Sequence, residues 1–223
     1  MKRGYSLPEF KILGNLIEIK DNITYLGVVL HKVLGFKAHV KAAAGKAQAT
    51  STALSRLMPN VGGSDQRKRA LLSTVVTSKV LYASPIWAVA LVFRGNVETL
   101  ERPQRAIALR VATAYHTVST AAVLVIAGLI PAHLPAWERM EMYRRRHEPD
   151  GRRVSTETRA AVMEKWQIVW TSGESGRWKQ RLINDVIAWR SRKHGVVDFH
   201  LTQFLFNHGC FGQYLQRFGV RED

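Results

Sequence analysis

Short apolar runs open the chain, and helical spacing of apolar residues then continues almost to its end. Gly14 and Asn15 separate two β-prone runs, residues 10–13 and 16–19. This pair is typical of a two-residue hairpin, because both residues accept a positive φ angle at little cost. Residues 25–30 form a third apolar run that is too short for a helix, and we interpret it as a third strand. The pattern therefore predicts a small antiparallel β element at the start of the chain.

The rest of the chain is predicted to be helical. Residues 37–58 carry apolar side chains on one stripe, and Ser64 is a suitable N-cap for a second helix that starts just after it. Residues 94–96 resemble a break before a third helix over 97–115, which starts at Pro103 instead if that proline interrupts the pattern. Further helices are predicted over residues 119–129, 136–146, 162–170, 178–189, 199–207 and 211–217.

Residues 144–153 are polar and charged, and they make the best candidate for a linker. We therefore divide the chain into a β element over residues 1–35, a helical domain over 36–147 and a second helical part over 148–223. The predicted fold class is mainly α with a small N-terminal antiparallel β element, an α+β chain whose bulk is a helical bundle.

The charge balance adds a partner class to this picture. Lys and Arg number 33 against 17 Asp and Glu, which gives a net charge of +16, and 46% of the residues are apolar. The apolar content indicates a folded protein. An excess of positive charge this large favours a polyanion as partner, nucleic acid first and an anionic membrane surface second.

The single cysteine, Cys210, excludes an internal disulfide and a Cys-x-x-Cys zinc pair. The start of the chain has no secretory signal pattern, and we expect an intracellular protein, nuclear or cytoplasmic and not secreted. Residues 71–93 are long enough to span a bilayer, but Lys79 would lie near its middle at a cost of about 3 kcal/mol. We interpret this stretch as a core helix that is kinked or ends near Pro85, and we expect no membrane partner.

Several strings of residues carry a resemblance to a known family. Residues 14–29 read GNLIEIKDNITYLGVV, residues 82–87 read YASPIW, and residues 109–120 read LRVATAYHTVST. Residues 199–205 and 208–211 continue the series with FHLTQFL and HGCF. In this order, over nearly the whole chain, they resemble the C-terminal part of the reverse transcriptases of non-LTR (LINE-type) retrotransposons, especially the Pol polyprotein of the insect R-one type.

The resemblance implies a palm-edge β element, a helical thumb-like domain and a helical post-thumb connector, which together grip the primer–template duplex of RNA and DNA. It also implies a primer-grip-like hairpin around Tyr25, Leu26 and Gly27. The family's catalytic palm holds Mg²⁺ ions on clustered aspartates, and this chain has no adjacent pair of aspartates. We therefore expect a fragment without the palm, with no cofactor and no small-molecule substrate of its own, that is inactive as a polymerase by itself.

Two groups of basic residues are candidates for phosphate contacts. The first lies on the two predicted helices that follow the β element: Lys37, Lys41, Lys46, Arg56, Arg67, Lys68 and Arg69. The second surrounds the predicted linker: Arg144, Arg145, Arg146, Arg152 and Arg153. For both groups the alternative is an ordinary solvated surface.

Two other constellations are weaker. Trp178 and Trp189 are interleaved with basic residues, as in sites that stack bases, but their helical spacing favours packing in the core. His208 and Cys210 are too close in sequence for the usual spacing of zinc ligands, so we expect no metal site. Two alternatives to a polymerase fragment stay open: a stand-alone basic helical nucleic-acid-binding module, and a decayed remnant without function.

Overall fold

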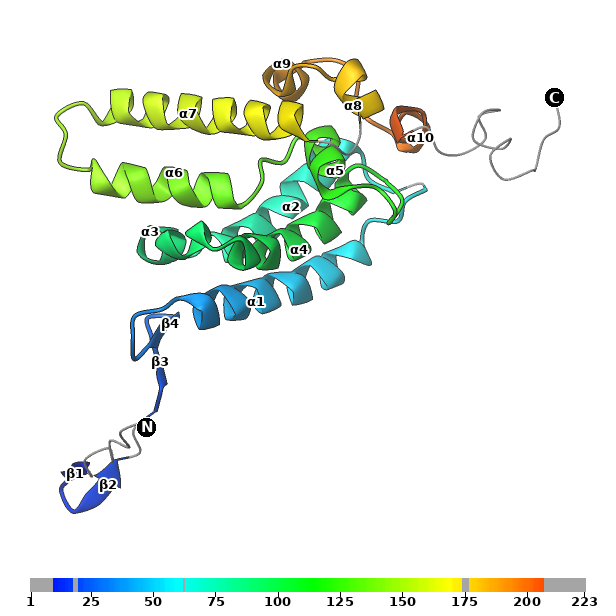
Figure 1. The fold of residues 1–223 in the computed structure, drawn as a ribbon. Helices are drawn as coiled ribbons and strands as arrows, with labels where there is room; N and C mark the ends of the chain where they lie inside the picture. The colour runs from blue at the N-terminus through cyan, green and yellow to red at the C-terminus, as the bar shows by residue number, and fades with distance from the viewer. Residues whose placement is uncertain (1–9, 18–19, 62, 174–176, 207–223) are drawn as a thin grey trace, which may run out of the picture.

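The computed structural model describes residues 10–17, 20–61, 63–173 and 177–206. Two separate antiparallel strand pairs precede a helical body (Figure 1). The elements are β1 (Phe10–Ile12), β2 (Asn15–Ile17), β3 (Asn22–Tyr25), β4 (Val28–His31), α1 (Lys37–Ser55), α2 (Gln66–Val80), α3 (Ser84–Trp87), the 3-10 helix η1 (Ala88–Val92), α4 (Arg94–Val111), α5 (Thr120–Ala127), α6 (His133–Arg144), α7 (Gly151–Ser172), α8 (Arg177–Leu182), α9 (Val186–Ser191) and α10 (Phe199–Phe206). The mainly helical fold with a small N-terminal β element is confirmed.

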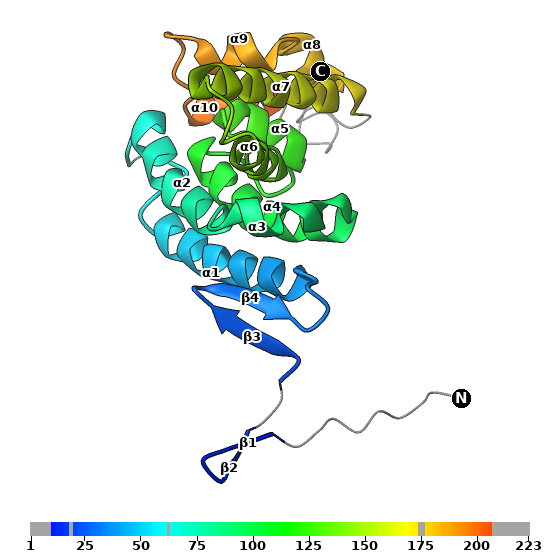
Figure 2. The same ribbon diagram turned by 90° about the vertical axis from the view of Figure 1, so that its left-hand side faces the viewer.

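The β element differs from the prediction in two ways. The first hairpin turns at Leu13 and Gly14, which both have positive φ, while Asn15 pairs with Ile12 inside the ladder. The expected third strand is itself a hairpin, because Leu26 and Gly27 also take positive φ and fold β3 onto β4. Positive φ at both turn residues fits the right-handed twist of the flanking strands. Figure 2 shows β4 next to α1, and β1 and β2 away from the helices.

Helix α4 lies at the centre of the helical body, where it packs against α1, α2, α5 and α6. It begins at Arg94, so the predicted break at 94–96 is wrong, and it continues through Pro103. Leu100, Pro103 and Ile107 form one buried stripe, and the packing of this stripe outweighs the backbone hydrogen bond that proline cannot donate.

Other predicted helix ends also move. The N-cap of α2 is Asp65 rather than Ser64, and its Oδ1 accepts a hydrogen bond from the Lys68 N–H at 2.9 Å. Helix α5 ends at Ala127 because Gly128 adopts a left-handed conformation. Helix α6 starts at His133, ahead of Pro135, since proline is tolerated in a first turn. The stretch predicted as one helix over 178–189 is two short helices, α8 and α9.

The core has two hydrophobic clusters. One fills the space between α1, α2, α3, α4 and α6, with Val40, Val76 and Trp87 fully buried. The other joins the end of α4 and α5 to α7, with Trp166 and Trp170 buried in it. The second cluster contains residues from both sides of the predicted linker at 144–153. Helices α6 and α7, which this segment joins, pack antiparallel to each other (Figure 1). The division at residue 147 stays a prediction.

Candidate nucleic-acid interface

Helices α1 and α2 belong to a stretch of the chain that is almost free of acidic residues. Between Asp21 and Glu98 the only acidic residue is Asp65. The basic residues of the same stretch are Lys32, Lys37, Lys41, Lys46, Arg56, Arg67, Lys68, Arg69, Lys79 and Arg94. Since acidic side chains are absent from both helices, their exposed faces carry positive charge without local compensation.

A groove of about 540 Å³ lies between α1, α2 and the turn that joins β3 to β4. Its floor is largely apolar, and it carries two ammonium groups, those of Lys46 from α1 and Lys79 from α2. The Lys79 Nζ donates a hydrogen bond to Thr50 Oγ1 at 2.6 Å, which ties α2 to α1. We call this the α1–α2 groove, lined among others by Gly27, Ala42, Lys46, Val75, Lys79 and Tyr82.

The β3–β4 turn closes one end of the α1–α2 groove. The Tyr82 hydroxyl donates a hydrogen bond to the Leu26 carbonyl at 2.9 Å, and the Tyr82 ring lies against Gly27. Of the three residues expected in a primer-grip-like hairpin, Gly27 lines the groove, while the side chains of Tyr25 and Leu26 are exposed. The hairpin is therefore held in a fixed place beside the two basic helices.

His39, which also lines the α1–α2 groove, holds β4 against α1. Its ring is buried against Trp87, and its Nδ1 accepts a hydrogen bond from the Val29 N–H at 3.2 Å. Burial, and then the nearby charge of Lys46, lower the pKa of His39 below its ordinary value. An accepting Nδ1 requires the neutral imidazole, and both effects favour that form.

The structure divides the first basic group. Lys37 and Lys41 lie on the α4 side of α1, where they line a different hollow together with Arg102. Arg56 follows the last residue of α1, about 28 Å from Lys37 at a rise of 1.5 Å per residue. Lys46 alone of this group lines the α1–α2 groove. Arg67 and Lys68 are exposed at the start of α2.

Arg69 does not belong to an exposed basic surface, and this prediction is wrong. Its side chain is 3% exposed. Its guanidinium donates hydrogen bonds to the carbonyls of Ser64 at 2.7 Å, Pro59 at 2.7 Å and Arg110 at 3.0 Å. Burial, followed by the charge of Arg110, lowers its pKa. Arg69 therefore ties the loop before α2 to the end of α4.

The second basic group is largely paired with carboxylates. Arg145 donates to Glu148 at 2.6 and 2.9 Å and to Glu157 at 2.8 Å, and these hydrogen bonds raise its pKa. Arg153 also contacts Glu157, at 3.2 Å, and the Arg146 guanidinium lies 4.2 Å from the centre of the Tyr143 ring. Arg144 lies 3.9 Å from Glu141. The carboxylates among these arginines reduce the positive charge of the α6–α7 tip.

The sequence analysis did not include two cations that line the hollows beside α1, and it did not predict the stacking of an arginine on Trp189. Lys79 and Arg102 were in neither basic group, although the scarcity of acidic residues between Asp21 and Glu98 marks the region of Lys79. Trp189 is partly buried against the core, as its spacing indicated, but the Arg192 guanidinium also stacks on its ring at 3.7 Å.

The described residues were also candidates for a metal site and for a membrane span. Among the described residues, no three His, Cys, Asp or Glu side chains gather as a metal site needs, and His208 and Cys210 lie outside these residues. No single described helix is both long and apolar enough to cross a bilayer. The pair Gln66–Val80 and Ser84–Val92 meets that criterion by length and composition, but it is bent by 51°.

Comparison with known proteins gives relatives of one kind. The chain is 24% identical over 230 residues to the "Retrovirus-related Pol polyprotein from type-1 retrotransposable element R1" of Bradysia coprophila. This alignment covers 96% of the chain and 23% of that relative. It is 25% identical over 240 residues to the corresponding R1 4 polyprotein of Nasonia vitripennis, and this alignment covers 98% of the chain and 59% of the relative. A "Putative 115 kDa protein in type-1 retrotransposable element R1DM" of Drosophila melanogaster is 24% identical over 227 residues, with 93% and 22% covered.

These matches support a protein derived from a non-LTR retrotransposon. All of these relatives carry names of the R1 type, which is the type that the sequence strings resemble. The chain spans between 22% and 59% of the length of the relatives described above. No family model matches the chain, and no solved structure matches it.

Proposed function

We propose that this chain is the part of an R1-type reverse transcriptase that grips the duplex of primer and template, and that the α1–α2 groove contacts its backbone. The proposal is based on the shape and lining of this groove. It has an apolar floor and two ammonium groups, Lys46 and Lys79, on helices without acidic residues.

The chemistry of a nucleic-acid strand fits this arrangement. The apolar floor suits the sugar faces of a strand, while ammonium groups neutralise its phosphates and release counterions. Contacts to phosphate fix position without reading bases. The hydrogen bond from Lys79 to Thr50 holds one ammonium in place, which reduces the entropy that this side chain loses on binding.

Catalysis of nucleotide addition is proposed to need another part of the polyprotein. Two-metal phosphoryl transfer requires clustered carboxylates, and this chain has no adjacent pair of aspartates. We predict that the purified chain does not extend a primer on an RNA template when Mg²⁺ or Mn²⁺ is added. Template-dependent incorporation by a preparation free of other polymerases would contradict the prediction.

The salt dependence of binding tests the groove. For the double variant Lys46→Gln/Lys79→Gln, the slope of log affinity against log salt should become shallower by about two, since each phosphate contact contributes about 0.9. The measurement is fluorescence anisotropy with a labelled RNA–DNA hybrid over a range of NaCl concentrations. Several hybrids of different sequence should give similar affinities.

The matched control removes the same charge elsewhere. Arg144→Gln/Arg152→Gln neutralises two exposed arginines at the α6–α7 tip and should leave the slope nearly unchanged. Thermal melting by circular dichroism confirms that each variant is folded. If the groove variant keeps the full slope, or if the tip variant loses as much, the α1–α2 groove is not the duplex contact.

A further inference from the structure

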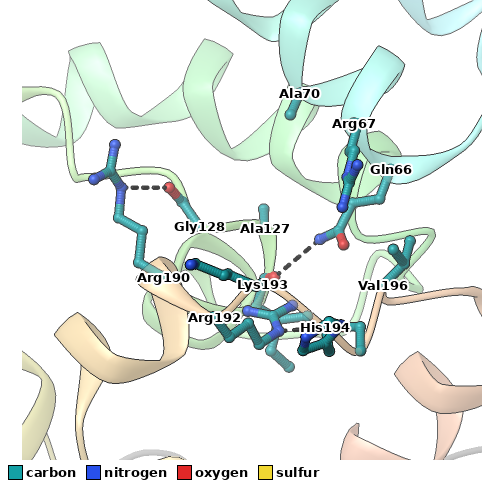
Figure 3. Close-up of a pocket in the computed structure, with 12 residues that line it drawn as sticks. Gln66, Arg67, Ala70, Ala127, Gly128, Arg190, Arg192, Lys193, His194 and Val196 are labelled. Atoms are coloured by element: carbon teal, nitrogen blue, oxygen red, sulfur yellow. Dashed lines mark hydrogen bonds between the residues drawn. The ribbon is translucent and has the colours of Figure 1, made fainter.

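A basic pocket lies near the N-terminal end of α2, between α2, the end of α5 and the segment after α9 (Figure 3). Its volume is about 370 Å³. Its basic lining residues are Arg67, Arg190, Arg192, Lys193 and His194, and none of the described residues that line it is acidic. We call it the α2–α9 pocket.

Two of its arginines build the wall. The Arg190 Nε donates to the Gly128 carbonyl at 3.3 Å, and the Arg192 Nε donates to the Gly195 carbonyl at 3.2 Å while its guanidinium stacks on Trp189. Burial lowers the pKa of both arginines. They therefore fix the loop after α9 against the end of α5.

The remaining basic residues of the pocket have no such role. Within the described part of the chain, the side chains of Arg67, Lys193 and His194 form no hydrogen bond or ion pair, and all three are exposed. Figure 3 shows Arg67 extending from α2 toward the loop that carries Lys193 and His194. Like charges gathered around one cavity repel one another, and a bound phosphate would relieve that repulsion with charge-assisted hydrogen bonds.

The exposed face of α2 connects this pocket with the α1–α2 groove. Arg67, Leu71, Thr74 and Ser78 are all exposed, and their spacing places them on one face of the helix. Arg67 and Lys79 are twelve residues apart, roughly 18 Å along the helix axis. That length corresponds to about five base pairs of duplex at 3.4 Å each. No acidic side chain of α2 interrupts the path.

We propose that the α2–α9 pocket is a second phosphate site, which binds the backbone of the same nucleic acid about five nucleotides from the α1–α2 groove. This inference rests on the proposed function, because it extends the same contact along α2. Arg67 and Lys193 supply the ligand contacts, and Arg190 and Arg192 hold them in position.

The test uses the 223-residue chain and the same labelled hybrid. Arg67→Gln/Lys193→Gln should make the salt slope shallower by about two, and combination with Lys46→Gln/Lys79→Gln should remove about four in total. The charge-keeping variant Arg67→Lys/Lys193→Arg should retain the full slope. These substitutions leave Arg190 and Arg192 intact, and circular dichroism confirms folding.

The outcomes separate the two proposals. If the pocket variant keeps the full slope while the groove variant loses its share, the pocket inference is overturned and the groove stands. If only the pocket variant loses slope, the pocket is supported and the groove fails. Vesicles of phosphatidylserine provide a second arm. Loss of vesicle binding in the pocket variant, with duplex binding unchanged, would assign the pocket to a lipid headgroup and overturn the inference.

Discussion

At the scale of single residues, neighbouring cations of this chain have opposite roles. Arg67 and Lys68 are exposed, whereas Arg69 is buried and its guanidinium holds three backbone carbonyls. Successive residues of a helix differ by about 100° in direction, so one of three adjacent cations can enter the core while the others remain in solvent. If these buried carbonyls lost their donor, the folded state would be destabilised, because a buried acceptor without a hydrogen bond costs free energy.

Arg69→Met is expected to lower the free energy of unfolding by about 3 kcal/mol, because a side chain of similar length leaves the three carbonyls without donors. Urea denaturation measures the loss. The matched control is Lys68→Met, one residue away and exposed, which should change stability by no more than about 0.5 kcal/mol. Equal effects of the two substitutions would mean that Arg69 has no structural role.

His39 gives the fold a dependence on pH. Burial, and then Lys46, lower its pKa in the folded chain below the 6.5 of the unfolded chain. The unfolded state therefore binds more protons below pH 6.5, and stability falls as the pH drops through that value until it passes the folded pKa. Above the unfolded pKa both states are neutral and the effect vanishes.

We expect the wild-type chain to lose more stability between neutral and mildly acidic pH than His39→Asn does. The asparagine oxygen can still accept from the Val29 N–H, where His39 Nδ1 accepts at 3.2 Å, but it does not titrate. Urea denaturation at several pH values provides the comparison. Parallel pH profiles for the two proteins would rule out His39 as the source.

The burial of Arg69 could have been predicted from the sequence. Arg69 stands four residues before Ser73 and seven before Val76, both buried, so its position on the apolar stripe of α2 was available from spacing alone. Lys46 and Lys79 could not be paired in the same way. They are 33 residues apart, and only the packing of α1 against α2 brings them to one groove.

At the scale of elements, turns explain most of the differences from prediction. Leu26 gives no polar turn signal, so residues 25–30 were interpreted as one strand, although Leu26 and Gly27 reverse the chain there. In α4 the proline pattern was misleading, because burial of Leu100, Pro103 and Ile107 stabilises a helix that local propensity disfavours. Helix α1 was predicted to within three residues of its observed end, because its apolar positions recur at helical spacing, whereas only residues 162–170 of the 22-residue α7 were predicted.

The β3–β4 turn offers a test with a close match. Gly27→Ala puts a methyl group 3.1 Å from a Tyr82 ring carbon and keeps a residue with a side chain at φ +79°. We expect the Val29 amide to exchange its hydrogen several-fold faster, which corresponds to about 1 kcal/mol. Gly14→Ala has a similar φ of +83° but nothing within 4 Å, and it should leave Val29 unchanged. An unchanged Val29 rate in Gly27→Ala would show that this turn is not held against Tyr82.

At the scale of the whole molecule, the distribution of charge distinguishes two regions. The region of α1 and α2 has almost no carboxylates, while the arginines of the α6–α7 tip have Glu148 and Glu157 beside them. A polyanion is attracted to uncompensated charge, so net charge alone, which the sequence supplied, does not locate the site. The location that we propose comes from the fold, which places the β3–β4 turn, α1 and α2 around one groove.

The most direct measurement of this account is a lysine-acetylation footprint of the whole chain, read by mass spectrometry with and without an RNA–DNA hybrid. Binding in the α1–α2 groove should lower the acetylation rates of Lys46 and Lys79 several-fold when the hybrid is present. Lys165, which lies on α7 over the Trp137 ring, should react at the same rate in both samples. If a hybrid that is bound under the same conditions leaves Lys46 and Lys79 as reactive as in its absence, the duplex does not lie in the α1–α2 groove and the central claim is contradicted.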